Sequence, residues 1–330
     1  MNFYNIFVRK SNTYIYMNKG AYIISGTLVL LFFAGMAIFV LRAYNVPMNN
    51  LFNSSAAMEQ ADTVRICEDI KYGAKERNLL DIYIPAGIDK NAEHGLILYL
   101  HGGSWTSGDK SSMADDCRNF AEKGYVTATM NYSFLNFSGE EKSDFTTMLT
   151  EIATALSTIK GYAAAQGVNI TKAALSGYSA GAHLAMLYTY SMADSSPLPV
   201  LFVQSKAGPA DFSTFSLDSP DAKEVMGRMG GDTDALNEAQ RAGIMAMMQA
   251  VSPVNHIRKG AAPALLAYGK KDTLVVWENV VSLMNAFIAN GVEYTLVEYP
   301  NSDHGLDKDT DRSKITEEKM VEFARKHFGY

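Results

Sequence analysis

The serine at position 179 stands in the pentapeptide GYSAG at 177–181, with one glycine two residues before it and another two residues after it. The apolar run "AAL" at 173–175 precedes this motif, and "AHLAMLYTY" at 182–190 follows it with the composition of a helix. A sharp turn between a strand and a helix presents a serine hydroxyl for nucleophilic attack, and side chains in place of the glycines would collide with neighbouring backbone. The alternative is an ordinary turn of small residues before an amphipathic helix.

A serine hydroxyl is a weak nucleophile and needs a base within hydrogen-bonding reach. Five of the six histidines have another interpretation: His94 in a polar surface loop, His101 before two glycines, His183 one helical turn after the serine, His256 in a loop, and His327 in the terminal helix. His304, in "YPNSDHGL" directly after the last expected strand, is the favoured base, because the order Ser, Asp, His places the histidine there. A solvated loop histidine is the alternative interpretation of His304.

The acid that orients this base is expected after a strand that lies between Ser179 and His304 in the chain. Asp272 in "ALLAYGKKDTLV" fits this position best. Asp211, which ends "SKAGPAD" after the preceding strand, is the second candidate. Asp303 adjoins His304 in sequence, and neighbouring side chains in an extended loop rarely face each other. Asp272 is therefore the favoured acid.

The segment "LYLHGGSWTSGDK" at 98–110 places a His-Gly-Gly run directly after a buried apolar stretch. A loop of this kind can direct backbone N–H groups at the oxyanion that forms when a serine attacks a carbonyl group. A glycine turn between a strand and a helix is the alternative. The four features occur in the right order along one chain, and together they favour a nucleophilic role for Ser179.

The elements that must position these residues alternate along the chain. Short apolar runs predict strands at 79–85, 95–103, 126–132, 172–178, 199–208, 263–272 and 293–300. Helical spacing of apolar residues predicts helices at 113–125, 144–167, 182–190, 279–291 and 315–328. Such alternation predicts an α/β fold with a mostly parallel sheet covered by helices on both faces.

The region 212–252 interrupts this alternation and contains five methionines, at positions 226, 229, 245, 247 and 248. Methionine side chains adapt to irregular contacts, so this insertion is a candidate cap over a substrate site. Ordinary helix packing with methionine as filler is an equal alternative. The cap would belong to one globular domain at 63–330.

The N-terminal part has a different composition. Residues 1–20 carry only positive charges, and residues 21–41 carry no charge at all. An apolar helix of this length spans roughly 30 Å, which is the thickness of the hydrocarbon core of a bilayer. The pattern predicts a cytoplasmic segment at 1–20, a transmembrane anchor at 21–41, a linker at 42–62 and a catalytic domain outside the cell. A cleaved signal peptide, which would give a secreted protein, is the alternative.

The net charge of −6 gives no indication of a nucleic-acid partner, which would need a basic face. Cys67 and Cys117 are too few for a disulfide scaffold, and free structural thiols are favoured over a bond between them. The sequence contains no HExxH, P-loop or GxGxxG motif, so neither a metal nor an organic cofactor is expected. Nothing in the composition predicts an oligomeric state.

The motifs "HGGSW…GDK", "GYSAGAHLA", "SPVNHI", "YGKKDTLV" and "SDHG" together resemble the α/β-hydrolase fold. The resemblance covers roughly residues 64–330. It is strongest to hormone-sensitive-lipase-like carboxylesterases and to the bacterial branch related to feruloyl and acetylxylan esterases.

The resemblance implies a triad of Ser179, Asp272 and His304. It also implies roles for residues around the triad: oxyanion donors from the backbone N–H groups of Gly103, Ser104 and Ala180, support of that loop by His101 and Gly102, and substrate contacts from Trp105 and Tyr178. The chain departs from the family pattern at Ser104, where a third glycine is common. It departs again at 132–134, where Tyr-Ser-Phe replaces the usual Tyr-Arg-Leu.

These features predict a membrane-anchored serine carboxylesterase that acts on small or carbohydrate-linked acyl esters without a cofactor. An arylformamidase or a peptidase of the prolyl-oligopeptidase type would use the same residues, and a lipase acting at its own membrane is a further alternative. A hydrolase fold kept as a binding module is the alternative from another class. That module would normally have lost the serine, the histidine or the glycines.

Overall fold

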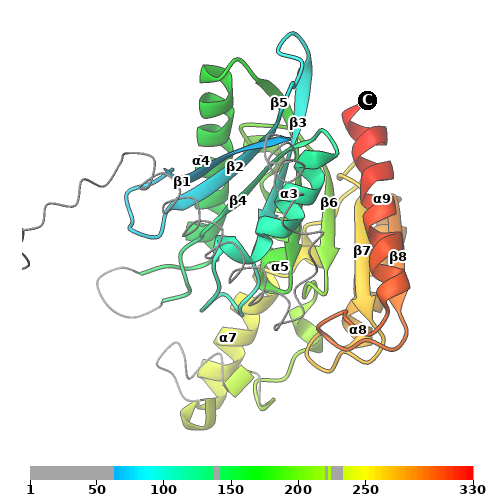
Figure 1. Cartoon of the computed structure of the whole chain (residues 1–330). Helices are drawn as coiled ribbons and strands as arrows, with labels where there is room; N and C mark the ends of the chain where they lie inside the picture. Colours follow the sequence, from blue (N-terminus) through cyan, green and yellow to red (C-terminus); the bar gives the residue numbers. More distant parts are fainter. Residues whose placement is uncertain (1–62, 137–141, 220–221, 224–232, 330) are drawn as a thin grey trace, which may run out of the picture. The chain divides into compact units, whose positions relative to one another are not determined.

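The computed structural model describes residues 63–136, 142–219, 222–223 and 233–329 of the chain. Within them, eight strands form one sheet in the order β1-β2-β4-β3-β5-β6-β7-β8 (Figure 1). The strands are β1 (Val64–Lys71), β2 (Leu79–Pro85), β3 (Glu93–Leu100), β4 (Val126–Met130), β5 (Asn169–Tyr178), β6 (Val200–Lys206), β7 (Ala264–Gly269) and β8 (Tyr294–Tyr299).

The six strands from β4 to β8 in this order run parallel to one another, while β2 pairs antiparallel with both β1 and β4. The expectation of a mostly parallel sheet is therefore confirmed. Parallel strands end at the same edge of the sheet, so the loops after β3, β5, β7 and β8 gather there. Those four loops carry the residues singled out in the sequence.

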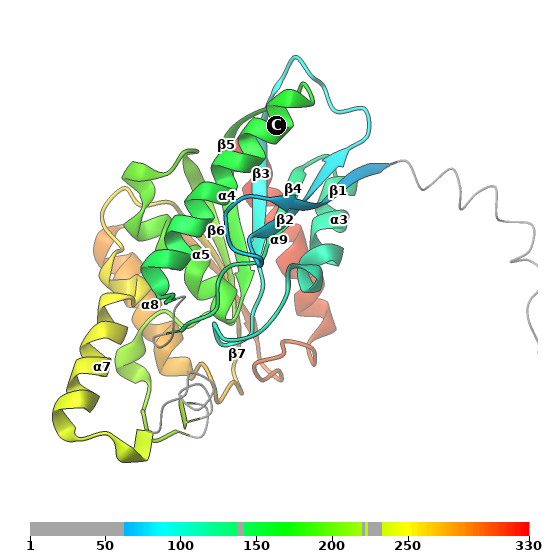
Figure 2. The ribbon, with the colours of Figure 1, turned by 90° about the vertical axis from the view of Figure 1, so that its left-hand side faces the viewer.

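Helices cover both faces of the sheet (Figures 1 and 2). The helices α4 (Phe145–Ala165), α5 (Ala180–Ser191) and α8 (Trp277–Asn290) pack on one face, and α3 (Ala114–Glu122) and α9 (Thr310–Phe328) pack on the other. A further helix, α7 (Glu238–Ala250), lies in the region 212–252 and has no buried residue.

The two cores follow from the alternation of side chains along the buried strands. In β3, Leu96, Leu98 and Leu100 belong to the core under α4 and α5, whereas Ile97 and Tyr99 belong to the core under α3 and α9. Successive side chains of a strand point to opposite faces, so a strand that is apolar throughout must be covered on both. This explains why β3 has an unbroken apolar sequence.

Two local features differ from the sequence-based expectation. Strand β1 is not predicted by its pattern, because it lies at the edge of the sheet, is mostly exposed or half-buried, and has a register shift between Cys67 and Ile70. The sequence predicted a surface loop at His94, and this prediction was wrong. His94 is the buried second residue of β3, where its Nε2 lies 2.7 Å from the carbonyl oxygen of Asp89. Pairing with β5 extends β3 beyond the apolar run into this polar stretch.

The predicted anchor at 21–41 and the linker at 42–62 lie outside the described residues. In the part of the chain that is described, no helix is both long enough and apolar enough to cross a bilayer. Cys67 and Cys117 are both free thiols, as expected, the first half-buried and the second buried.

Candidate active site

Ser179 occupies the turn between β5, which ends at Tyr178, and α5, which begins at Ala180. Its backbone has φ 53° and ψ −120°, a conformation that residues with side chains rarely adopt. The N–H of Ser179 donates to the carbonyl oxygen of Lys206 at 2.8 Å, which ties the strained turn to the neighbouring strand β6. The surrounding sheet thus holds a conformation that the serine alone would not favour.

The two glycines of the motif are required by close backbone contacts. A Cβ on Gly177 would lie 2.4 Å from the carbonyl carbon of Gly181. A Cβ on Gly181 would lie 2.1 Å from the carbonyl oxygen of Leu100, at the end of β3. Neither position has room for a side chain, because the neighbours are backbone atoms that cannot move aside. The collision expected from the sequence is therefore confirmed.

A chain of hydrogen bonds connects Ser179, His304 and Asp272. The Oγ of Ser179 lies 2.9 Å from Nε2 of His304, and Nδ1 of His304 lies 2.8 Å from Oδ2 of Asp272. The other carboxylate oxygen, Oδ1, accepts the N–H groups of Leu274 and Val275, both at 2.9 Å. The carboxylate side chain is fully buried and the imidazole is 23% exposed. The carboxylate therefore holds the Nδ1–H tautomer, which leaves Nε2 free to accept the serine proton.

The other acids considered from the sequence have different partners. Asp211 accepts the N–H of Ser213 at 2.9 Å and the hydroxyl of Ser282. Asp303 pairs with Lys308 on the exposed side of its loop. The structure thus brings Asp272, rather than either alternative, to His304.

Tyr178 supports the histidine loop. Its hydroxyl donates to the carbonyl oxygen of His304 at 2.6 Å, and burial raises the pKa of Tyr178 to about 12, so the proton stays on the hydroxyl. Tyr178 is not among the described residues that line the cavity beside Ser179. The hydrogen bond of its hydroxyl instead helps to position His304.

The loop after β3 passes directly over Ser179. Three consecutive residues, Gly103, Ser104 and Trp105, have positive φ values of 116°, 51° and 60°. A Cβ on Gly102 would lie 3.4 Å from Cβ of Ser179. Successive N–H groups in such a turn can converge on an anion. Among the hydrogen bonds of the described residues, none has the N–H of Gly103, Ser104 or Ala180 as its donor, so these groups remain available.

His101 holds the start of this loop through contacts of its buried ring. The residue is fully buried, its ring stacks on Tyr132 at 4.2 Å, and its Nδ1 lies 2.7 Å from the carbonyl oxygen of Gly102. Burial lowers the pKa of His101 to about 4, so the ring is neutral near pH 7. A Cβ on Gly108 would lie 2.4 Å from Nδ1 of His101, which explains the glycine at the far end of the loop.

Arg77 is a supporting residue that no sequence motif indicated. Its Nη2 donates to the carbonyl oxygen of Gly108 and lies 3.2 Å from Nε2 of His101, while its Nε donates to the carbonyl oxygen of Tyr132 at 2.9 Å. The guanidinium also lies 3.8 Å from the centre of the Phe134 ring. Arg77 lies in the turn before β2, far in sequence from the segment 132–134. It nevertheless contacts Tyr132 and Phe134 of that segment, which lacks the arginine usual in the similar family.

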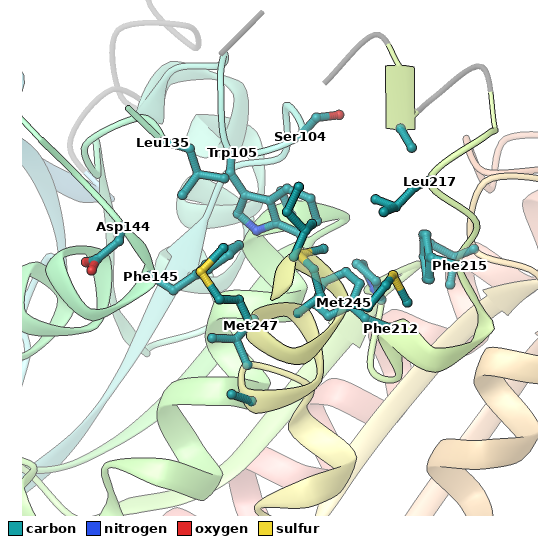
Figure 3. A pocket seen from close by; sticks show the side chains of 18 of the residues that line it. Ser104, Trp105, Leu135, Asp144, Phe145, Phe212, Phe215, Leu217, Met245 and Met247 are labelled. Carbon is teal, nitrogen blue, oxygen red and sulfur yellow. The ribbon is translucent and has the colours of Figure 1, made fainter. Parts of the chain in front are cut away.

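A cavity of about 550 Å³ opens beside Ser179 (Figure 3). Its walls combine Ser104 and Trp105 of the loop, Phe145 at the start of α4, and residues of the region 212–252, among them Met245, Met247 and Met248 of α7. Trp105 and Ser179 thus line the same cavity, and a contact between Trp105 and substrate remains a prediction. The methionines that suggested a cap in the sequence line the same space as Ser179.

His183 ties three parts of this cavity together. It is fully buried in α5; its Nδ1 accepts the indole N–H of Trp105 at 3.2 Å, and its Nε2 lies 2.8 Å from the carbonyl oxygen of Val251, just after α7. Burial lowers the pKa of His183 to about 4, which keeps the ring neutral with its proton on Nε2. His183, on α5, therefore contacts both the loop after β3 and the end of α7.

Comparison with known proteins identifies the family. Residues 80–287 match the BD-FAE protein family, which is more than half of the chain. The chain belongs to the BD-FAE family. Among curated proteins of Mycobacterium tuberculosis, it is 26% identical to the probable carboxylic ester hydrolase LipM over 63% of this chain. It is also 24% identical to the esterase LipQ over 79% of this chain. The match spans 48% of the length of LipM and 62% of LipQ.

The solved structures agree on the fold. Esterase B from Lactobacillus rhamnosis superposes with a TM-score of 0.62 at 18% identity, over 84% of this chain and 94% of that one. At this identity the likeness concerns the fold alone, which is the α/β-hydrolase fold. The BD-FAE match begins at β2 and ends in α8, so it contains Ser179 and Asp272, while His304 follows it.

We expect stability to fall as the pH is lowered from about 6.5 to about 4, because His101 and His183 have a pKa of about 4 in the folded state and an ordinary pKa when unfolded. In this pH range the unfolded chain binds more protons than the folded one. Each histidine therefore lowers the free energy of unfolding by up to about 3 kcal/mol between pH 6.5 and pH 4. Urea unfolding at several pH values measures the slope. The variant His183→Gln should have lower stability near pH 7 and a shallower slope below pH 6.5. An unchanged slope would contradict this assignment.

We expect Arg77→Ala to lower the free energy of unfolding by about 1–3 kcal/mol, because it leaves the carbonyl groups of Gly108 and Tyr132 without their donor. Arg77→Lys should recover only part of the loss, since an ammonium group cannot donate in two fixed directions as a guanidinium does. Urea unfolding provides the measurement, with Lys71→Ala at the exposed end of β1 as the control. A stability of Arg77→Lys equal to that of wild type would contradict this expectation, because it would show that charge alone matters.

Proposed function

We propose that this member of the BD-FAE family is a serine carboxylesterase that uses Ser179 as nucleophile, His304 as general base and Asp272 as the acid that orients it. The observation that carries the proposal is the hydrogen-bond chain of 2.9 and 2.8 Å through these residues, at the side of a cavity. The names of the curated relatives, a probable carboxylic ester hydrolase and an esterase, support the same class of reaction.

The proposed reaction has two acyl-transfer steps. Nε2 of His304 takes the proton of Ser179 as Oγ bonds to the ester carbonyl carbon, and the carbonyl oxygen becomes an oxyanion. The N–H groups of Gly103, Ser104 and Ala180 stabilise that oxyanion, each worth about 10²–10³ in rate by comparison with other serine hydrolases. The C–O bond to the alcohol then breaks, and His304 returns the proton to the leaving alcohol.

Water completes the cycle. It attacks the acyl-enzyme carbonyl while His304 takes its proton, and collapse of the second tetrahedral intermediate returns that proton to Oγ of Ser179 and releases the acid. Asp272 remains a carboxylate and stabilises the positively charged imidazole in both steps. The same residues could cleave an aryl formamide or a peptide. Hydrolysis of these two substrates is therefore compared with hydrolysis of an ester.

The alcohol part of the ester is proposed to be small or carbohydrate-linked. A second, more open groove of about 550 Å³, lined mainly by residues with polar side chains, shares Asp144 and Thr146 with the first cavity and is also lined by Lys75, Thr147 and Thr150. Hydroxyl, carboxylate and ammonium groups of this kind pair with alcohol hydroxyls. A hydroxyl-rich alcohol can therefore extend from the ester towards this groove.

We expect Ser179→Ala to reduce hydrolysis of p-nitrophenyl acetate by at least about 10³-fold, because the nucleophile is removed while the fold is kept. The purified full chain is assayed by release of p-nitrophenol. Ser191→Ala, at the end of the same helix, is the control and should retain activity. If wild type and Ser179→Ala were equally inert on the ester, on an aryl formamide and on a peptide, the binding-module interpretation would replace the proposal.

The same proposal places the protein in the cell membrane through residues 21–41, with residues 1–20 in the cytoplasm and the catalytic domain outside. We expect the full chain to sediment with membranes and to resist extraction by high salt, whereas a chain lacking residues 1–41 should be released. N-terminal sequencing of the mature protein separates the alternatives. A new N-terminus close to residue 38 would show a cleaved signal peptide and a secreted protein.

A further inference from the structure

The cavity beside Ser179 is apolar over nearly all of its surface. Its aromatic side is formed by Trp105, Phe145, Phe212 and Phe215 (Figure 3). Its aliphatic side is formed by side chains before, on and directly after α7: Leu217, Ile244, Met245, Met247, Met248 and Val251. A polar group placed here would lose its water without gaining a partner, which is costly. The lining therefore favours an apolar part of the substrate.

The wall formed by α7 is partly exposed to solvent. None of its residues is buried, and Met247 is 55% exposed although it lines the cavity. When a ligand covers apolar side chains that are in contact with water, the free energy of the complex falls, which favours binding. Methionine side chains also adapt their shape to flexible ligands. This wall thus fits a flexible hydrocarbon chain.

The charges around the cavity set a second condition. Asp144 is the one charged residue among the described residues that line it. Its Oδ1 accepts the N–H and the hydroxyl of Thr147 at 2.8 and 3.0 Å, and Figure 3 shows its carboxylate pointing away from the aromatic and methionine side chains. The described lining residues include no cation that could pair with a second carboxylate on the acyl group. It therefore favours an acyl chain without charge.

The size of the cavity sets the length. A water molecule occupies about 30 Å³ of liquid, so 550 Å³ is many times the volume that an acetyl group needs. We propose that this cavity is an acyl-binding site for a neutral, flexible acyl chain of medium length, longer than butyryl and shorter than palmitoyl, with α7 forming part of the wall that limits its length. The inference rests on the proposed ester hydrolysis at Ser179 and adds the class of acyl group to it.

The test measures kcat/KM of the detergent-solubilised full chain on p-nitrophenyl acetate, butyrate, hexanoate, octanoate, decanoate and palmitate. The activity is expressed as a ratio to that on acetate, so that the active fraction of each preparation cancels. Full burial of one methylene corresponds to roughly a fourfold gain, so the ratio should rise by about two- to fourfold with each added carbon up to the limit and fall at palmitate.

Two substitutions test the role of α7. Met245→Trp fills the cavity and should move the best substrate to acetate or butyrate, with at least about a tenfold loss in the octanoate ratio. Met245→Ala enlarges the cavity and should move the optimum to longer chains. Ala246→Trp introduces the same large side chain at an exposed position that does not line the cavity, and should leave the profile unchanged.

The outcomes separate the two proposals. If wild type does not hydrolyse acetate above the level of Ser179→Ala, the proposed function fails. If acetate is hydrolysed but the ratio falls steadily with chain length, or Met245→Trp and Ala246→Trp give the same profile, the acyl-binding site is overturned and the esterase stands. A profile still rising at palmitate would also overturn the length limit and favour a lipase.

Discussion

The site depends on the close approach of the first turn of α5 to the end of β3. Neighbouring parallel pairing sets Leu100 opposite Gly177, and the chain after β5 then turns so tightly that a Cβ on Gly181 would lie 2.1 Å from the carbonyl oxygen of Leu100. This contact brings the serine turn beneath the loop that follows β3. Ser179 and the loop after β3 are therefore placed together by one backbone contact, which only glycine permits.

Two buried histidines connect loops of this site to its helices and to neighbouring segments. His101 joins the loop after β3 to Arg77 and Tyr132, and His183 joins Trp105 to the chain that follows α7. Each ring is neutral and uses one nitrogen as donor and the other as acceptor, which satisfies both without a buried charge. The stability of the fold depends on pH as a result, because protonation would turn the accepting nitrogen of each ring into a donor.

Much of the fold is readable from local patterns. The strand predicted at 79–85 has the same bounds as β2, and the helix predicted at 279–291 ends at Gly291, whose left-handed backbone closes α8. Edge strand β1 and buried His94 were not readable, because pairing with a neighbouring strand, rather than local composition, decides both. The same limit applies to the site. Ser179, Asp272 and His304 follow from motif and order, but nothing near Arg77 in sequence indicates that it reaches the loop after β3.

The sequence by itself determined the alternation of strands and helices, the glycines around Ser179 and the order of the residues that meet there, because each of these is set by local backbone requirements. The tertiary structure brought the favoured carboxylate, Asp272, to His304, and it alone decided that Tyr178 supports the histidine loop and that the methionines of α7 line the cavity. These are contacts between segments far apart in the chain. They depend on the packing of whole elements, which no short stretch of sequence specifies.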